Sequence, residues 1–334
     1  MHAFFDPGQL AHAPVQELHN GGWTPYAEVP ARARAILDAI GGAAPPVDHG
    51  DAAIRAVHGG DYLDFLQGAA AEWAAAGRGG DVIGYVWPVV GRRPLKLSRI
   101  DARIGQFSFD ASTPIMAATY AASYGATQSA LSALDAVLAG ERTAFALSRP
   151  PGHHAGADYC GGYCYLNHAA VVAQAARDAG VARVAILDID YHHGNGTQDI
   201  FWERGDVFYA SVHADPATDY PFYWGHGDEV GAGAGEGATL NLPLPQGTGI
   251  DAFRAAHATA LDAIARFAPG LLVVSFGADT FIGDPISHFR LATADYAPIA
   301  RDIAACGWPT VIVMEGGYAV DALGANVASF LSGF

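Results

Sequence analysis

Residues 184–198, with the sequence VAILDIDYHHGNGTQ, constrain the fold more than any other stretch of the chain. The segment begins as a short apolar run with β-branched residues, which is typical of a strand buried on both faces of a parallel sheet. It continues into polar side chains and two glycines, as a strand-to-helix loop does. Ligands of open α/β sheets bind where the strands end. The segment therefore predicts an α/β fold with a functional site directly after this strand.

Three polar residues of this segment alternate along the chain: Asp188, Asp190 and His192. On an extended backbone every second side chain points to the same side. A carboxylate and an imidazole two residues apart can therefore bind one metal ion. A solvated polar loop is the simpler explanation for a single Asp-x-His pattern. The choice between such a loop and a metal site therefore depends on matching residues elsewhere in the chain.

Two further apolar runs, at residues 271–276 and 310–314, also lead into polar groups. Strands that alternate with helices predict a mostly parallel sheet with helices on both faces. If the three runs are central strands, then Asp190 and His192 meet Asp279 and Tyr318 at one edge of the sheet. No repeat or linker divides the sequence, so residues 1–334 are expected to form a single domain.

Two carboxylates and one imidazole make a three-ligand site with an open position, which is the pattern of a catalytic metal. Zinc is the expected ion, and Fe²⁺ or Co²⁺ also suit these ligands. A binuclear site would need bridging carboxylates, but the positions where they would stand hold Gly194 and Phe281. One ion is therefore expected, and a guanidine hydrolase with two manganese ions is disfavoured.

His153 and His154 lie in a Pro-Pro-Gly loop and suit proton transfer. Each needs a partner that fixes its tautomer, and Asp188 and Asn195 are available for this. Tyr318 follows two glycines, where its hydroxyl can donate to an oxyanion. A surface His-His pair or a packing tyrosine would be the ordinary explanation of either feature alone.

Charge and composition exclude several classes of protein. The chain of 334 residues has a formal net charge of −16, which argues against nucleic-acid binding and favours cationic small molecules or basic peptides. The three cysteines, an odd and small number, argue against a disulfide framework and fit a reducing cytoplasm. No apolar run approaches the roughly 20 residues of a membrane span, and the N-terminus lacks a basic secretory signal.

Residues 77–110 differ from the rest of the chain. They contain an aromatic stretch, and residues 91–103 hold five of the 18 basic residues: Arg92, Arg93, Lys96, Arg99 and Arg103. We expect an insertion loop, which either contacts a second subunit or is a solvated segment. An Ala-rich helix is predicted to follow over residues 113–139, ending at Gly140.

Together the motifs resemble the histone deacetylase superfamily. The matching stretches are RPPGHH at 149–154, GYCYLN at 162–167, DIDYHHGNGTQ at 188–198, GADT at 277–280 and EGGY at 315–318. The resemblance implies an arginase/deacetylase-like open sheet of about eight strands. Within the superfamily, the chain length, the insertion near 85–110 and Ile286 are most similar to the bacterial acetylpolyamine amidohydrolases.

The resemblance also implies roles for individual residues. Asp190, His192 and Asp279 would bind Zn²⁺. His154 would act as general base and acid, with His153 as its electrostatic companion, and Tyr318 would polarise the acetyl carbonyl. A structural K⁺ would be held by Asp188, Ser211 and backbone carbonyls that include that of Val212. Asn195 stands where some relatives carry Asp.

The substrate would be an acetylated polyamine: acetylputrescine, acetylcadaverine or acetylspermidine. Acetyl-lysine peptides are the alternative, and a non-catalytic binder of acetylated ligands is a hypothesis of another class. The resemblance places a substrate tunnel at Gly162, Tyr163 and an aromatic residue at 222–223, chosen as Tyr223, with Asp110 at the rim. Ile286 replaces the glutamate gatekeeper of one eukaryotic branch. The insertion at 77–110 would form a homodimer contact and narrow the tunnel mouth.

Overall fold

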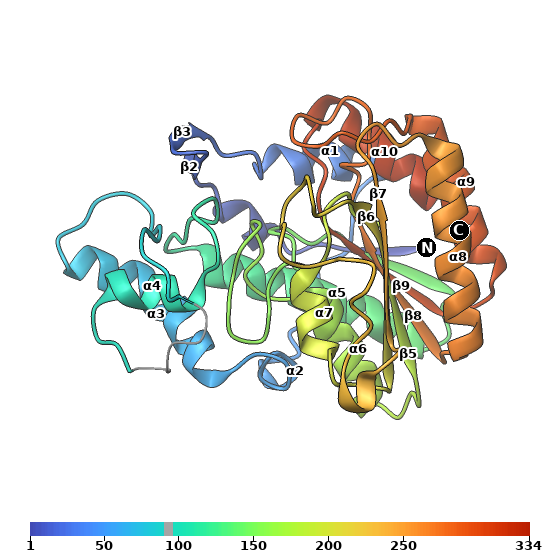
Figure 1. The fold of residues 1–334 in the computed structure, drawn as a ribbon, viewed down its shortest axis with the longest axis horizontal. Helices are drawn as coiled ribbons and strands as arrows, with labels where there is room; N and C mark the ends of the chain where they lie inside the picture. Colours follow the sequence, from blue (N-terminus) through green and yellow to red (C-terminus); the bar gives the residue numbers. More distant parts are fainter. Residues whose placement is uncertain (90–95) are drawn as a thin grey trace.

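The computed structural model describes residues 1–89 and 96–334. Its centre is a seven-stranded parallel sheet with the order β1-β4-β9-β8-β5-β6-β7 (Figure 1). The strands are β1 (His2–Phe4), β4 (Thr143–Ala146), β9 (Thr310–Met314), β8 (Leu271–Phe276), β5 (Val184–Asp188), β6 (Val207–Ala214) and β7 (Thr239–Leu244). The predicted α/β class is confirmed. The sheet has seven strands where about eight were expected, and β2 (Gln16–His19) and β3 (Gly22–Pro25) form a separate antiparallel hairpin.

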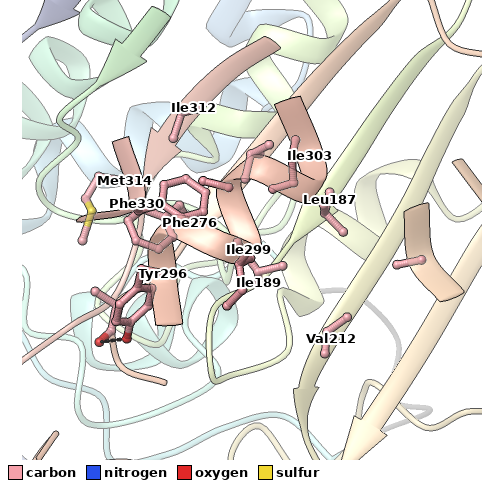
Figure 2. Packing of buried hydrophobic residues seen from close by; sticks show 14 of the residues in the cluster. Leu187, Ile189, Val212, Phe276, Tyr296, Ile299, Ile303, Ile312, Met314 and Phe330 are labelled. Carbon is pink, nitrogen blue, oxygen red and sulfur yellow. Dashed lines mark hydrogen bonds between the residues drawn. The ribbon is translucent and has the colours of Figure 1, made fainter. Parts of the chain in front are cut away.

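The strands direct alternate side chains into two helical layers. Val184 and Ile186 of β5 join a buried cluster with α5 (Thr119–Leu138), α6 (His168–Asp178) and α7 (Asn195–Phe201). Ala185 and Leu187 join the larger cluster on the opposite face, which is shown in part in Figure 2. That face is covered by α1 (Ala31–Ile40), α8 (Ile250–Phe267), α9 (Thr293–Ala305) and α10 (Val320–Leu331). Burial on both faces explains why the strand sequences are continuously apolar.

A third cluster lies beside the sheet, at the left of Figure 1. It combines α2 (Ala52–Arg55), α3 (Gly60–Ala75) and α4 (Ile100–Phe107), so the predicted insertion at 77–110 is partly helical. Arg99 and Arg103 form ion pairs with Asp101 and Glu72. Arg92 and Arg93, two of the basic residues of the expected insertion, lie outside the described part of the chain.

The helix predicted to begin at residue 113 begins at Thr119. Pro114 disfavours helical geometry at the residue before it, and Ile115 forms a β-bridge with Val82. The hydroxyl of Thr113 accepts a hydrogen bond from the backbone N–H of Tyr163 at 3.0 Å. Long-range contacts therefore hold residues 113–115 in an extended conformation.

The three central strands β9, β8 and β5 are direct neighbours in the sheet, as the sequence predicted. Because they are parallel, their carboxyl ends lie at the same edge, and the loops that follow bring their polar residues together. Within residues 1–89 and 96–334, none of the helices combines the length and apolarity needed to cross a bilayer.

Candidate active site

The loops after β5 and β8 place Asp190, His192 and Asp279 next to one another. Backbone N–H groups orient both carboxylates. Oδ1 of Asp190 accepts from the N–H of His192 at 2.9 Å, and its Oδ2 accepts from that of Gly316 at 2.8 Å. Oδ1 of Asp279 accepts from the N–H of Tyr191 at 2.9 Å. Each carboxylate is therefore fixed by at least one backbone N–H of a neighbouring loop.

These three residues have the geometry of a metal site. Nδ1 of His192 lies 3.1 Å from Oδ2 of Asp279 and 3.4 Å from Oδ1 of Asp190. One ligand atom from each residue lies within 4.8 Å of the others. Among the described residues, only histidines form ion pairs with the two buried carboxylates. A divalent cation would neutralise the pair, so the donor set fits a transition metal.

Two glycines let the backbone approach this cluster closely. A Cβ at Gly277 would overlap the Asp190 carboxylate, and one at Gly316 would lie 2.6 Å from Oδ2 of Asp190. Burial and the neighbouring Asp190 charge raise the pKa of Asp279 to about 7. The fold therefore keeps two carboxylates together in a buried setting that disfavours their joint ionisation without a cation.

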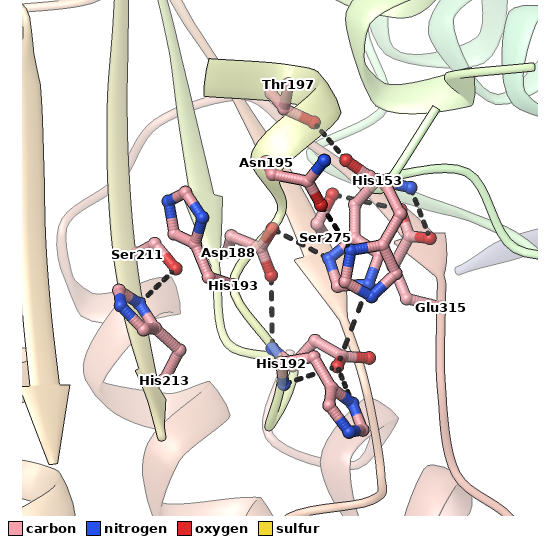
Figure 3. A network of polar contacts seen from close by, with 12 residues as sticks. His153, Asp188, His192, His193, Asn195, Thr197, Ser211, His213, Ser275 and Glu315 are labelled. Atoms are coloured by element: carbon pink, nitrogen blue, oxygen red, sulfur yellow. Dashed lines mark hydrogen bonds and ion pairs between the residues drawn. The ribbon is translucent and has the colours of Figure 1, made fainter. Parts of the chain in front are cut away.

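His153 is held by acidic groups. Its Nδ1 lies 3.0 Å from Oδ2 of Asp188, and its backbone N–H donates to Oε2 of Glu315 at 3.1 Å; this network is shown in Figure 3. Burial lowers the pKa of His153, but the carboxylates of Asp188 and Asp190 outweigh it and raise the pKa to about 10. His153 is therefore an imidazolium at neutral pH.

His154 has a neutral partner. Its Nδ1 lies 2.7 Å from Oδ1 of Asn195, whose Nδ2 donates to the hydroxyl of Tyr159. Because an amide oxygen only accepts, Nδ1 of His154 carries the proton and Nε2 remains a free acceptor. Burial, followed by the charges of His153 and His192, lowers the pKa of His154 well below its usual value. The two adjacent histidines thus differ in charge because their partners differ.

Tyr318 is buried behind the same cluster. Its ring meets that of Tyr163 edge-on at 5.6 Å, and the guanidinium of Arg32 lies 4.9 Å from its centroid. Arg32 also donates to the carbonyls of Gly317 and Glu315, which fixes the loop. Burial raises the pKa of Tyr318 well above its usual value, although Arg32 acts in the opposite direction. The phenol therefore stays protonated and can donate.

The predicted rim residues separate into two groups. Oδ2 of Asp110 accepts from the N–H of Gly162 at 2.7 Å, from the hydroxyl of Tyr220 at 2.9 Å and from Ser112 Oγ at 3.1 Å. Gly162 lies so close to the His154 ring that a Cβ there would overlap it. Tyr163 is buried, but Ile286 is 36% exposed and Tyr223 is 83% exposed.

The sequence analysis missed Tyr220. Its ring lies edge-on to His154 at 5.1 Å and to His192 at 6.1 Å, so it occupies the place expected for Tyr223. The aromatic residues at 220–224 indicated a wall of the substrate tunnel, but the sequence did not identify which of them faces the catalytic histidines. A left-handed backbone at Phe222, with φ of +62°, changes the direction of the chain within this run.

The residues predicted to hold K⁺ lie behind the catalytic groups. Asp188 and Ser211 are register partners in β5 and β6. Oδ2 of Asp188 accepts from the hydroxyl of Tyr209 at 3.1 Å, and Oγ of Ser211 lies 2.8 Å from Nδ1 of His213. Val212 follows in β6 and is buried. The cation site itself stays a prediction.

The sequence and the fold of this chain are similar to those of known proteins. A family model described as "Histone deacetylase domain" matches residues 26–334. The chain is 47% identical over 332 residues to acetylpolyamine amidohydrolase 1 of Pseudomonas aeruginosa, covering 97% of this chain and 95% of the relative. It is 46% identical to acetylpolyamine amidohydrolase of Mycoplana ramosa, with coverage of 95% and 94%. The crystal structure of acetylpolyamine aminohydrolase from Burkholderia pseudomallei superposes with a TM-score of 0.96 at 42% identity, covering 100% of this chain and 98% of that one.

Proposed function

Since the chain belongs to the histone deacetylase family, we propose that it is a metal-dependent amidohydrolase that removes acetyl groups from acetylated polyamines. The observation that carries the proposal is the grouping of three elements: the ligand set Asp190, His192 and Asp279, the neutral His154, and the protonated Tyr318. Zinc is the proposed ion, and Fe²⁺ or Co²⁺ would fit the same donors.

The three ligands would hold one divalent ion, whose Lewis acidity polarises a carbonyl oxygen and acidifies water. The free Nε2 of His154 takes a proton from the water that attacks the acetyl carbon, and later gives a proton to the departing amine nitrogen. The hydroxyl of Tyr318 donates to the oxyanion that develops on the carbonyl oxygen. The His153 imidazolium adds positive charge, which acts together with the larger effect of burial to keep His154 neutral. The products are acetate and the free amine.

The walls of the site suit a narrow acyl chain. We place the acetylated arm between the rings of Tyr163 and Tyr220, over Gly162 and below Asp110. The net charge of −16 and the carboxylate at the rim favour a cationic substrate. Acetylputrescine, acetylcadaverine and acetylspermidine are narrow, cationic molecules of this kind. An acetyl-lysine peptide also carries a peptide backbone, which must fit at the entrance of the site.

A comparison of kcat/KM for acetylputrescine, acetylspermidine and an acetyl-lysine peptide on the purified enzyme tests this function. We expect both acetylpolyamines to be preferred over the peptide. A higher kcat/KM for the peptide would identify a protein deacetylase instead. Stoichiometric binding of acetylputrescine with no release of acetate by the metal-loaded protein would identify a non-catalytic binder.

We also propose that residues 1–334 form a single deacetylase domain that dimerises through the insertion at 77–110. Tyr85, Val86 and Val89 are 66%, 54% and 69% exposed, which is unusual for neighbouring apolar residues and marks an interaction surface. Triple substitution of these residues by Ser should convert a dimer into a monomer in analytical ultracentrifugation. An unchanged mass would refute this role.

A structural K⁺ near Asp188, Ser211 and Val212 is a further proposal, and Asn195 is proposed to fix the tautomer of His154. A cytoplasmic location is also proposed, because all three cysteines are free thiols in the structure. Replacing K⁺ by tetramethylammonium should lower thermal stability if the cation is bound. An unchanged melting temperature would argue against it.

A further inference from the structure

Tyr159 and Asp199 lie behind the histidine pair, and no step of the proposed reaction uses either side chain. The hydroxyl of Tyr159 donates to Oδ2 of Asp199 at 2.6 Å, and the same hydroxyl accepts a hydrogen bond from Nδ2 of Asn195 at 3.3 Å. At the other end of the amide, Oδ1 of Asn195 lies 2.7 Å from Nδ1 of His154. Four side chains therefore form one hydrogen-bonded chain, which runs from an exposed carboxylate to the proposed general base.

Short stretches of sequence place the members of this chain. Asn195 is in the first turn of α7 (Figure 3), and Asp199 is four residues further on, so both side chains lie on one face of the helix. Tyr159 folds back over the loop of His154 through a turn in which the N–H of Gly156 donates to the Tyr159 carbonyl at 3.0 Å. A Cβ at Gly156 would overlap the Tyr159 ring. The phenol is therefore held where it meets both side chains of α7.

The direction of the hydrogen bonds is set at the outer end of the chain. An ionised carboxylate accepts hydrogen bonds and donates none. Burial, followed by the neighbouring Asp199 carboxylate, raises the pKa of Tyr159 well above its usual value, so the phenol keeps its proton and donates it to Asp199. A lone pair of the hydroxyl then faces Asn195. The amide must present its NH₂ group to Tyr159, which leaves its oxygen for His154.

Without the carboxylate, the rest of the chain would not fix this direction. The oxygen and nitrogen ends of an amide have nearly the same shape, so packing alone does not distinguish them. A phenol can donate as well as accept. The chain could then run in reverse, with Nδ2 of Asn195 donating to Nδ1 of His154. His154 would carry its proton on Nε2, where it could not take a proton from water.

We propose that Asp199, acting through Tyr159, orients the Asn195 amide and thereby keeps the proton of His154 on Nδ1, which leaves Nε2 free as the base. Asp199 and Tyr159 are positioning residues, since they act on the reaction through Asn195. The inference deepens the proposed function, because it names what sets the tautomer of its general base. A tie that only joined the loop after β4 to α7 would stabilise the fold, but it would not depend on which end of the amide faces His154.

NMR of the zinc-loaded protein labelled with ¹⁵N-histidine tests the proposal, because protonated and unprotonated ring nitrogens differ in chemical shift. The signals of His154 are those that disappear in His154→Ala. Asp199→Asn keeps the shape of the side chain but adds donors, so the direction of the chain is no longer imposed. The ratio of the Nδ1–H to the Nε2–H tautomer should fall by about 10- to 100-fold, which corresponds to the contribution of one hydrogen bond to a charged group.

The same variants give a kinetic prediction. Only the Nδ1–H form of His154 leaves Nε2 free, so kcat for acetylputrescine should fall in proportion to the fraction of that form, while KM stays within about threefold of the wild-type value. Tyr159→Phe should shift the ratio in the same direction. The double variant of Tyr159→Phe and Asp199→Asn should shift it no further, because Asp199 acts through the phenol. Asp199→Glu keeps a charged acceptor and should restore most of the Nδ1–H form.

Asp48→Asn is the matched control. Asp48 is an exposed carboxylate that accepts a hydrogen bond from the hydroxyl of Tyr124, a half-buried tyrosine of α5, so this pair has the same chemistry as Asp199 and Tyr159. No hydrogen bond among the described residues links the control pair to His154. The substitution changes the net charge by the same amount as Asp199→Asn and should leave both the tautomer ratio and kcat unchanged.

Four outcomes would overturn the inference. A wild-type His154 protonated on Nε2 would refute the direction of the chain. An unchanged ratio in Asp199→Asn, or in Tyr159→Phe if the first variant does not fold, would leave the pair a structural tie. An equal shift in Asp48→Asn would attribute the effect to net charge, and a further shift in the double variant would show that Asp199 acts independently of Tyr159. If the wild type does not hydrolyse acetylputrescine, the proposed function fails, and the tautomer ratios still decide whether Asp199 orients Asn195.

Discussion

Substitution of Gly162 by alanine tests whether this glycine sets the position of His154. Gly162 has a φ of +54°, in the left-handed region. A Cβ there would lie 2.6 Å from Cγ and 2.9 Å from Nε2 of the His154 ring, whereas carbon contacts are normally about 3.5–4.0 Å. The ring would therefore have to move by roughly 1 Å. A displacement of that size at a reacting group costs about a hundredfold in rate.

Two effects contribute to this prediction, and the chain offers a control that separates them. Gly233 has a φ of +57° and nothing within 4 Å of an added Cβ. Gly233→Ala should therefore show only the left-handed backbone penalty of about 1–2 kcal/mol. Gly162→Ala should show the same penalty together with an overpacking cost of about 1–3 kcal/mol and the loss of rate.

The assay is kcat for acetylputrescine alongside the denaturation midpoint of each variant. We expect both variants to lose stability, and only Gly162→Ala to lose about two orders of magnitude in kcat. If Gly162→Ala turns over as fast as Gly233→Ala, then the contact with His154 does not determine catalytic geometry, and the account of the tunnel floor is wrong.

Two further predictions concern the phenol and the metal. Tyr318→Phe should lower kcat by about 10²–10³ with the metal content unchanged, and near-normal turnover would refute the oxyanion role. Zinc at about 100 times its Kd should stabilise the wild type by about 2.7 kcal/mol in thermal or chemical unfolding but should have little effect on Asp279→Ala; equal stabilisation would place the ion elsewhere.

Much of the fold could be predicted from local patterns. The runs that became β5, β8 and β9 are short and continuously apolar, which only strands buried on both faces require. The polar residues that follow them could be assigned to one site because parallel strands bring their carboxyl ends to the same edge. The boundary of α5 could not be predicted, since the bridge between Ile115 and Val82 is a contact between distant segments.

The partners of the histidine pair show where local reasoning ends. Asp188 and Asn195 were both available to either histidine, and their different chemistry decides which ring is charged. The structure assigns Asp188 to His153 and Asn195 to His154. The choice depends on how the loop that follows β4 faces the loop that follows β5, and no spacing along the chain encodes it.

The sequence by itself determined the three central strands, their shared edge and the ligand types, because periodicity and short-range sterics act over a few residues. Only the tertiary structure decided that Tyr220 rather than Tyr223 faces His154, and that Glu17 meets Tyr163 from 146 positions away. Such contacts are set by the packing of whole elements against one another. Side chains that recognise a substrate from several segments at once therefore become visible only when the chain is folded.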